Sequence, residues 1–175
     1  MPRSTDSFFL RFEQDATGSF TQQSEDLGAF VDALGQSVLR IHNVSIQYSD
    51  AGGVTNGLAV DENTVAVCAW QITTQSQDAM ITQGDRSMVS CGSLIGAYPK
   101  TGNGTATGLT MLTEDASLNP EDFTNGYLIA VEQLYFGVMR NGNWDTDDIK
   151  VSAVLECTVE KLSKEAALAL ALSQQ

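Results

Sequence analysis

The chain has a single histidine, His42, among its 175 residues, and this limits the chemistry open to the protein. A Ser-His-Asp hydrolase needs a histidine beside an activated nucleophile, and no serine or cysteine here lies in an identifiable nucleophile elbow. A metal site of the cupin type needs several histidines, so His42 alone cannot form one. His42 lies in a strand-like segment close to Arg40, and we interpret it as a structural residue.

Two acidic features are further candidates for chemistry. Glu132 lies in an apolar, strand-like segment, where a carboxylate can serve in a pocket, although such residues more often point outward or pair with arginine. Glycosidases need two acids across a cleft, and the sequence singles out no pair. The segment Asn141–Asp148 offers oxygen ligands at alternate positions but lacks the glycine and the terminal glutamate of an EF-hand. An acidic turn is the simpler interpretation, and calcium binding stays open.

The three cysteines are Cys68, Cys91 and Cys157, an odd number with wide spacing and no C-x-x-C pair. This arrangement supports neither a zinc ribbon nor a redox motif. Each lies in an apolar run, so we expect small buried residues; one disulfide stays open, and the sequence does not choose its pair. Trp70 and Trp144 could stack on sugars, but Trp70 lies in a run that predicts burial. We therefore predict a non-enzymatic protein with no catalytic, cofactor-binding or metal-binding residues.

The charge balance argues against binding to nucleic acid. Nine lysine and arginine residues stand against 22 aspartate and glutamate residues, which gives a net charge of −13 and a pI near 4.1. Binding to DNA or RNA depends on cations that neutralise phosphates, and here the cations are few and dispersed. The acidity favours solubility, including in salty water, where salt screens the repulsion between carboxylates.

The length predicts one domain over residues 1–175, with residues 1–7 as an amino-terminal arm. The chain has no apolar run of about 20 residues, so we expect no transmembrane helix. Residues 1–7 have neither an apolar core nor a cleavage site, so we expect no secretory signal.

Alternation of apolar and polar residues indicates an all-β fold. In Ile149–Lys161 the odd positions up to Val159 are apolar and most even positions are polar, as in a strand with one buried face. Val38–Tyr48 alternates too, but slips near His42–Asn43, which suggests a β-bulge. Residues 126–139 are apolar on both faces, with a break expected at Glu132–Gln133. Further strands are expected at residues 8–12, 57–60, 64–72 and 87–98, and polar loops at 73–83 and 101–108. Seven or eight strands without βαβ alternation predict a sandwich or barrel.

Helical signals are confined to short segments. Asn119–Phe123 has a capping residue and a proline at the first helical position, which predicts a single-turn helix. Ser163–Leu172 begins with a capping serine and carries Leu168 and Leu172 on one face. This helix is too short to be stable alone, so it must dock on its own sandwich or on a neighbouring subunit. For Asp26–Gly35 the choice between helix and strand stays open, with a slight preference for strand.

The end of the chain resembles a known family. The expected strands 127–139 and 149–162, followed by a helix after Lys161, cover about the last 50 residues and are similar to the end of single jelly-roll capsid proteins of tailless icosahedral viruses. The small, acidic coat subunits of viruses of marine or halophilic archaea are particularly similar. The resemblance implies an antiparallel single jelly-roll sandwich of about eight strands, with a short carboxy-terminal helix and tail at 163–175.

The resemblance also implies a function. We expect a structural, non-enzymatic capsid protein, made in the host cytoplasm, that assembles into the virion shell with copies of itself and other capsid proteins. Residues 1–7 contain one cation, Arg3, so they lack the basic arm of many RNA-virus coats, and a membrane or another layer would separate this shell from the genome. The alternative is a β-sandwich module that binds a carbohydrate or a receptor. The sequence gives neither the host nor the lattice position nor the oligomeric state.

Overall fold

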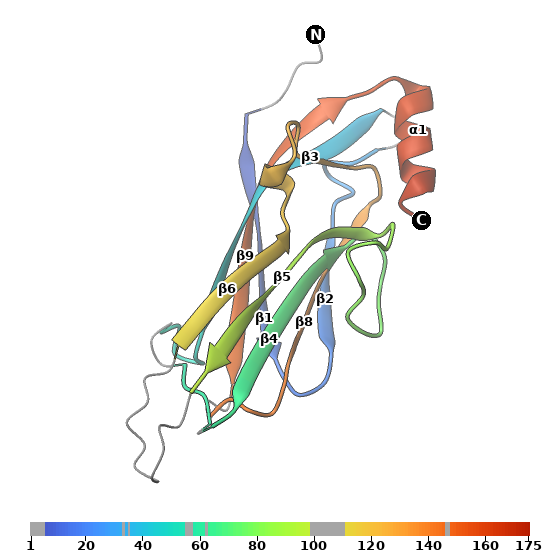
Figure 1. Cartoon of the computed structure of the whole chain (residues 1–175). Helices are drawn as coiled ribbons and strands as arrows, with labels where there is room; N and C mark the ends of the chain where they lie inside the picture. Colours follow the sequence, from blue (N-terminus) through green and yellow to red (C-terminus); the bar gives the residue numbers. More distant parts are fainter. Residues whose placement is uncertain are drawn as a thin grey trace.

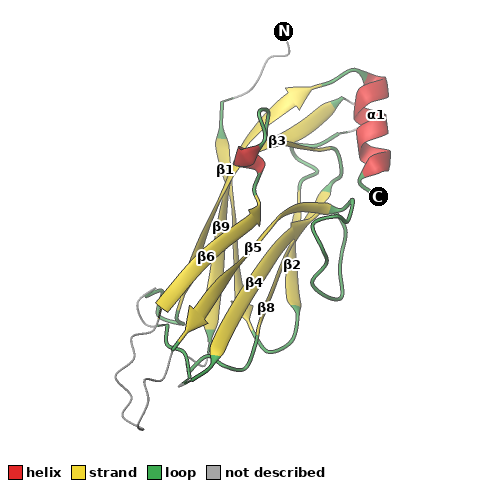
Figure 2. Cartoon of the chain, viewed as in Figure 1, coloured by secondary structure: helices red, strands yellow, loops and turns green. Residues whose placement is uncertain are grey.

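The computed structural model describes residues 6–32, 34, 36–54, 58–61, 63–98, 111–145 and 148–175. These residues form two antiparallel β-sheets, a short 3-10 helix and a carboxy-terminal α-helix (Figures 1 and 2). The elements in chain order are β1 (Phe8–Ala16), β2 (Thr21–Asp26), β3 (Ser37–Ser49), β4 (Val65–Thr73), β5 (Met88–Ala97), β6 (Met111–Leu118), the 3-10 helix η2 (Pro120–Asp122), β7 (Tyr127–Ile129), β8 (Gln133–Arg140), β9 (Ile149–Lys161) and α1 (Lys164–Ser173).

The strand order is that of a single jelly roll. One sheet has the order β1-β9-β3-β7 and the other β2-β8-β4-β5-β6. The pairs β1–β9, β2–β8, β3–β7 and β4–β5 are all antiparallel, as if a long ribbon of nested strand pairs had been rolled up. Successive pairs alternate between the two sheets, which confirms the expected fold class. A ninth strand, β6, extends the larger sheet beyond β5.

The apolar core lies between the two sheets. Its largest fully buried side chains include Trp70 of β4, Phe136 of β8 and Ile41 of β3. β9 contributes most regularly, because it lies between β1 and β3 and presents every second side chain to the core. The fully buried residues of β9 are Ile149, Val151, Ala153, Leu155 and Cys157. The alternation predicted for this segment is therefore confirmed.

A β-bulge in β3 lies at the predicted place. The register against β9 shifts between Ile41 and Asn43, so His42 is the extra residue. Before the bulge Leu39 and Ile41 face the core; after it, Val44 and Tyr48 do. The bulge is needed because apolar residues occupy odd positions on one side of His42 and even positions on the other, and a regular strand would expose one of these sets.

Residues 126–139 form two strands rather than one. β7 ends at Ile129 and pairs with β3, whereas β8 begins at Gln133 and pairs with β2 and β4. The chain crosses from one sheet to the other at residues 130–132, so the break expected at Glu132–Gln133 is confirmed and begins two residues earlier. The outward side of β7 is apolar because Leu128 packs against α1.

Two edge strands were not predicted. β2 consists of polar residues only, and in β6 every residue except Leu118 is exposed. Both lie at the edges of the five-stranded sheet, where backbone pairing with one neighbour holds a strand without burial of alternate side chains. Their sequences consequently lack the alternation that identified the central strands.

The described residues of 26–35 form neither the preferred strand nor a helix. Asp26 ends β2, and a single helical turn follows, in which Val31 N donates to Leu27 O at 2.9 Å. Asp32 then forms an isolated bridge with Ser37, while residues 33 and 35 lie outside the described residues. The turn buries Leu27 and Val31, so the helical spacing is used for one turn only.

The strand expected at 57–60 is reduced to an isolated bridge between Val60 and Trp144, and Gly57 lies outside the described residues. The loop expected at 73–83 is present, held by Gln71, whose side chain donates to Ala79 O and accepts from Ile81 N. The loop expected at 101–108 lies outside the described residues.

Both short helices form where they were expected. η2 begins at Pro120, although the side chain of Asn119 makes no capping hydrogen bond. In α1 the Ser163 hydroxyl accepts from Ala166 N at 3.2 Å, the predicted cap. α1 docks on its own sandwich, where Ala167 and Ala171 pack against residues of β3 and of the segment after β7. Figure 1 shows the helix beside one end of the sandwich.

Gln174, directly after α1, ties the helix to both sheets. Its side chain donates to Leu128 O at 2.6 Å and accepts from Ala130 N at 3.0 Å, as a neighbouring strand would. Its backbone carbonyl accepts from Thr74 Oγ1 at 2.9 Å and from Gln75 Nε2 at 3.1 Å. Because only 3% of the surface of Gln174 is exposed, its polar groups form their hydrogen bonds with the protein instead of with water.

We expect Gln174→Ala to lower the free energy of unfolding by about 1–3 kcal/mol, because it leaves the buried Ala130 N–H and Leu128 carbonyl without partners. Gln175→Ala, at the exposed neighbouring residue, is the matched control and should unfold like the wild type. Urea unfolding followed by circular dichroism measures both. Equal stability of the two variants would contradict the role given to Gln174.

Candidate functional site

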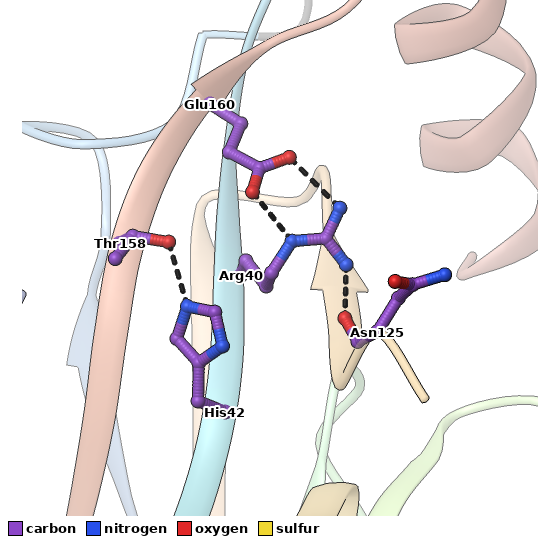
Figure 3. Close-up of polar contacts among 5 residues, drawn as sticks. All are labelled: Arg40, His42, Asn125, Thr158 and Glu160. Atoms are coloured by element: carbon purple, nitrogen blue, oxygen red, sulfur yellow. Dashed lines mark hydrogen bonds and ion pairs between the residues drawn. The ribbon is translucent and has the colours of Figure 1, made fainter. Parts of the chain in front are cut away.

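A hollow of about 520 Å³ on the outer face of the four-stranded sheet contains His42, the histidine of this chain. Arg40 and His42 of β3 and Glu160 of β9 form its floor, and η2 and the turn before β7 form its other side. Glu121 and the half-exposed ring of Phe123 lie on that side. Figure 3 shows the polar side chains of the floor converging from β3 and β9.

An ion pair between Arg40 and Glu160 dominates the electrostatics of the hollow. Arg40 Nε lies 2.6 Å from Glu160 Oε1 and Nη2 lies 2.8 Å from Oε2, a bidentate geometry (Figure 3). The side chains are only 16% and 13% exposed, so water screens the pair poorly. The hydrogen bonds from Arg40 lower the pKa of the Glu160 carboxyl, and those to Glu160 raise the pKa of Arg40.

The turn before β7 is brought against the ion pair by a glycine. Gly126 has φ +63°, and a side chain there would collide with the Ile41 carbonyl oxygen. This close approach lets Arg40 Nη1 donate to the Asn125 carbonyl. Arg40 therefore links β3, β9 and the turn, and its charge is neutralised within the protein.

His42 is oriented by the bulge and by β9. Its Nε2 lies 2.9 Å from Thr158 Oγ1, one strand away (Figure 3). The bulge leaves His42 on the same outer face as Arg40, instead of in the core. The hollow thus combines an imidazole, a neutralised guanidinium, carboxylates and an aromatic edge, a set suited to hydrogen bonding and stacking.

The remaining candidates from the sequence lie elsewhere and do not converge. The three cysteines are free thiols; burial raises the pKa of Cys68 and of Cys157 to about 12 and also raises that of Cys91. These thiols are protonated at neutral pH and are poor nucleophiles. Glu132 is exposed on the crossing between β7 and β8 rather than within an apolar strand.

The asparagines of the segment 141–148 bind backbone. Asn141 Oδ1 accepts from Val67 N at 3.0 Å, and Asn141 Nδ2 and Asn143 Nδ2 donate to Val65 O at 3.1 and 2.8 Å. In the candidate calcium loop these side chains therefore form hydrogen bonds with the backbone of β4, which agrees with the interpretation as a turn. Residues 146 and 147 lie outside the described residues. Both tryptophans are buried, Trp70 to 1% and Trp144 to 5% exposure, so neither presents a ring to a sugar.

A second hollow, of about 210 Å³, lies beside β6. Its walls are mainly apolar, with Ile46 and Tyr48 of β3 facing Leu94 of β5 and Leu112 of β6. β3 pairs with β7 only over Leu39–Ile41, so the larger sheet extends past the smaller one here. The inner face of β6 is consequently left partly uncovered.

Within the described residues, no group of three or more histidine, cysteine or acidic side chains is placed to hold a metal ion. In the same part of the chain no helix is long and apolar enough to cross a bilayer. The sequence matches no protein-family model, and a comparison with curated proteins finds no match.

Glu160 and Asn125 are members of this site that the sequence did not predict. Glu160 occupies an outward position of β9, which the alternation does predict, but nothing local indicates that Arg40 lies beside it. Asn125 contributes its backbone carbonyl, which no side-chain pattern reveals.

We expect the Arg40–Glu160 pair to give a pH-dependent share of stability. Because the pKa of Glu160 is lower in the folded than in the unfolded chain, this share is present at neutral pH and is lost as the pH falls below about 4. Glu160→Gln should lower the free energy of unfolding by about 1–2 kcal/mol at pH 7, and the difference from the wild type should shrink in acid. Urea unfolding at pH 3 to 7 measures it.

Glu156→Gln, on the same strand and the same outer face, is the matched control for this experiment. It should show a smaller change at pH 7. A difference between Glu160→Gln and the wild type that stays constant from neutral to acid pH would contradict the assignment.

Proposed function

We propose that this protein is a structural, non-enzymatic subunit of a viral capsid, which assembles into the virion shell with copies of itself and with other capsid proteins. The observation that carries the proposal is the strand order: four nested antiparallel pairs rolled into two sheets, an architecture common in viral coats. A fold can host many functions, so the chemistry of the surface must agree with it.

The exposed apolar side chains support assembly. Single exposed apolar residues are ordinary on any protein, but here several lie on the same elements. Leu168 and Leu172, 42% and 64% exposed, lie one turn apart on α1, and Met111 and Leu112, 58% and 41% exposed, lie on opposite faces of the edge strand β6. A shell subunit meets several neighbours through interfaces of modest size, so separate apolar patches on different elements are what such a subunit requires.

The charge distribution supports a shell that does not touch its genome. With a net charge of −13 the subunit repels a polyanion at long range. Among the few cations, Arg40 binds Glu160, and Lys150 lies 3.0 Å from Glu13 and 3.2 Å from Asp15. Arg40 and Lys150 thus form ion pairs with acidic side chains of the same subunit. In this proposal a membrane or another protein layer separates the shell from the nucleic acid, and the subunit is made in the host cytoplasm.

The second candidate is a module that binds a carbohydrate or a receptor. The hollow around His42 favours it, because Phe123 is 48% exposed at the rim beside Glu121 and the hydrogen-bonding groups of the floor. An aromatic ring next to carboxylate and imidazole groups suits a sugar. A glycan array distinguishes the two: binding that Phe123→Ala abolishes would favour the module.

Self-assembly should depend on salt. The repulsion between highly charged copies extends about 10 Å at 0.1 M salt and about 3 Å at 1 M, so high salt should favour association through apolar contacts. We expect light scattering of the purified protein to show capsomers or closed particles whose amount rises with NaCl concentration, and electron microscopy to show them as ordered. A monomer at every salt and protein concentration would contradict the proposal.

Binding to nucleic acid should be undetectable even at low salt, where charge interactions are least screened. In a gel-shift or polarisation assay at about 20 mM salt, we expect no complex with double-stranded or single-stranded DNA. A basic DNA-binding protein is the positive control. Tight, salt-sensitive binding would contradict the separation of this shell from its genome.

A further inference from the structure

The hollow beside β6 lies between strands of the two sheets. After the bulge the even residues of β3 face inward, so Ile46 and Tyr48 pack against the core. On β6, Glu114 pairs with the core residue Leu94, so Glu114 and Leu112 lie on the inner face of that strand. The hollow, of about 210 Å³, is the space that these side chains leave between the sheets.

The Tyr48 hydroxyl is a buried donor without an acceptor. Tyr48 is 5% exposed, and its hydroxyl has no hydrogen-bond partner among the described residues. The neighbouring indole of Trp70 cannot supply an acceptor, because its N–H is a donor only, and it too is buried without a partner. Burial raises the pKa of Tyr48, so the hydroxyl keeps its hydrogen at neutral pH. Since a buried hydroxyl without a partner costs free energy, the site lacks an acceptor.

Water is a poor candidate for that acceptor. A buried water molecule needs two to four polar partners. Around Tyr48 the walls of the hollow are the apolar side chains of Ile46, Leu58, Leu94 and Leu112. An acceptor atom that is attached to an apolar body fits these walls better, because the body buries apolar surface while the acceptor binds the hydroxyl.

Size and charge narrow the class of ligand. A cavity of about 150 Å³ with apolar walls holds benzene, so this hollow has room for roughly eight non-hydrogen atoms. Glu114 is exposed and lines the hollow, and the whole chain has a net charge of −13. Both repel a carboxylate or a phosphate. The ligand is therefore neutral, and its polar atom is an acceptor.

We propose that this hollow binds a small, neutral, apolar carbonyl compound whose oxygen accepts from the Tyr48 hydroxyl and whose hydrocarbon chain lies against Ile46, Leu94 and Leu112. One hydrogen bond in apolar surroundings fixes the direction of the ligand, with its oxygen at Tyr48 and its chain along the walls. The inference goes beyond the proposed coat function and does not depend on it.

A pair of isosteric probes tests the hydrogen bond. In 2-heptanone and 2-methyl-1-heptene the same hydrocarbon chain carries either a carbonyl oxygen or a methylene group. We expect both to bind the wild type saturably at low salt, with shifts in the methyl NMR signals of Ile46 and Leu94. Tyr48→Phe should weaken the binding of the ketone roughly tenfold and leave that of the alkene unchanged. Equal affinity of Tyr48→Phe and the wild type for the ketone would overturn the proposal.

Two tryptophan variants on β6 test the place of binding. Leu112→Trp puts a large ring into the hollow and should abolish binding of 2-heptanone. Met111→Trp is the matched control, because Met111 is the exposed neighbour on the opposite face of the strand, and it should bind like the wild type. Heptanoate, the anion of similar length, should bind the wild type at least tenfold more weakly than the ketone. Equal binding by both tryptophan variants would place the ligand elsewhere and refute this site.

The stability of Tyr48→Phe without ligand is a second, independent measurement. Removal of a buried hydroxyl that has no partner should leave the melting temperature unchanged or raise it. A lower melting temperature would show that the hydroxyl already has an acceptor within the protein, and this would overturn the proposal.

These outcomes are separate from those that test the coat function. A wild type that forms particles but shows no saturable binding of 2-heptanone would refute the ligand site and leave the coat proposal standing. A monomer at every salt concentration that binds the ketone through Tyr48 would refute the coat proposal and support the site.

Discussion

The pairing of the first strand with the last is the interaction on which the rest of the structure depends. All nine residues of β1 pair with β9, from Phe8 opposite Cys157 to Ala16 opposite Ile149. β9 in turn pairs with β3 along nearly its whole length, so its register decides which side chains of three strands face the core. The same register brings Lys150 to Glu13 and Asp15, and Glu160 to Arg40.

The outer face of this sheet shows how a backbone irregularity and a polar site can have one cause. The bulge at His42 keeps two apolar sets of β3 in the core, and it also leaves the imidazole beside Arg40 on the outside. Arg40, which forms the ion pair, also binds the turn at Gly126 and so holds it against β3. This is the end of the sheet where β7 pairs with β3 over only three residues. The hollow is thus built from groups that already bind one another, which makes it a rigid surface.

The protein is strongly acidic, but its surface also has places without charge. Long-range repulsion keeps copies of this chain apart unless salt screens it or apolar patches meet. α1 satisfies its own sandwich with small alanines and Gln174 and leaves its leucines outside. The helix thus meets its own sandwich with its small residues and leaves Leu168 and Leu172 exposed to solvent.

The sequence by itself determined the all-β class, the buried face of β9, the bulge at His42 and the serine that begins α1. Each of these is encoded within a few neighbouring residues, as a burial period or a local hydrogen bond. Only the tertiary structure decided that β2 and β6 are strands, that the chain changes sheet at 130–132, and that Gln174 joins both sheets. It also decided that Arg40 meets Glu160, 120 positions away. The physical reason is that these features depend on which strands become neighbours and in what register, and polar edge strands or distant ion pairs leave no periodic trace in the chain.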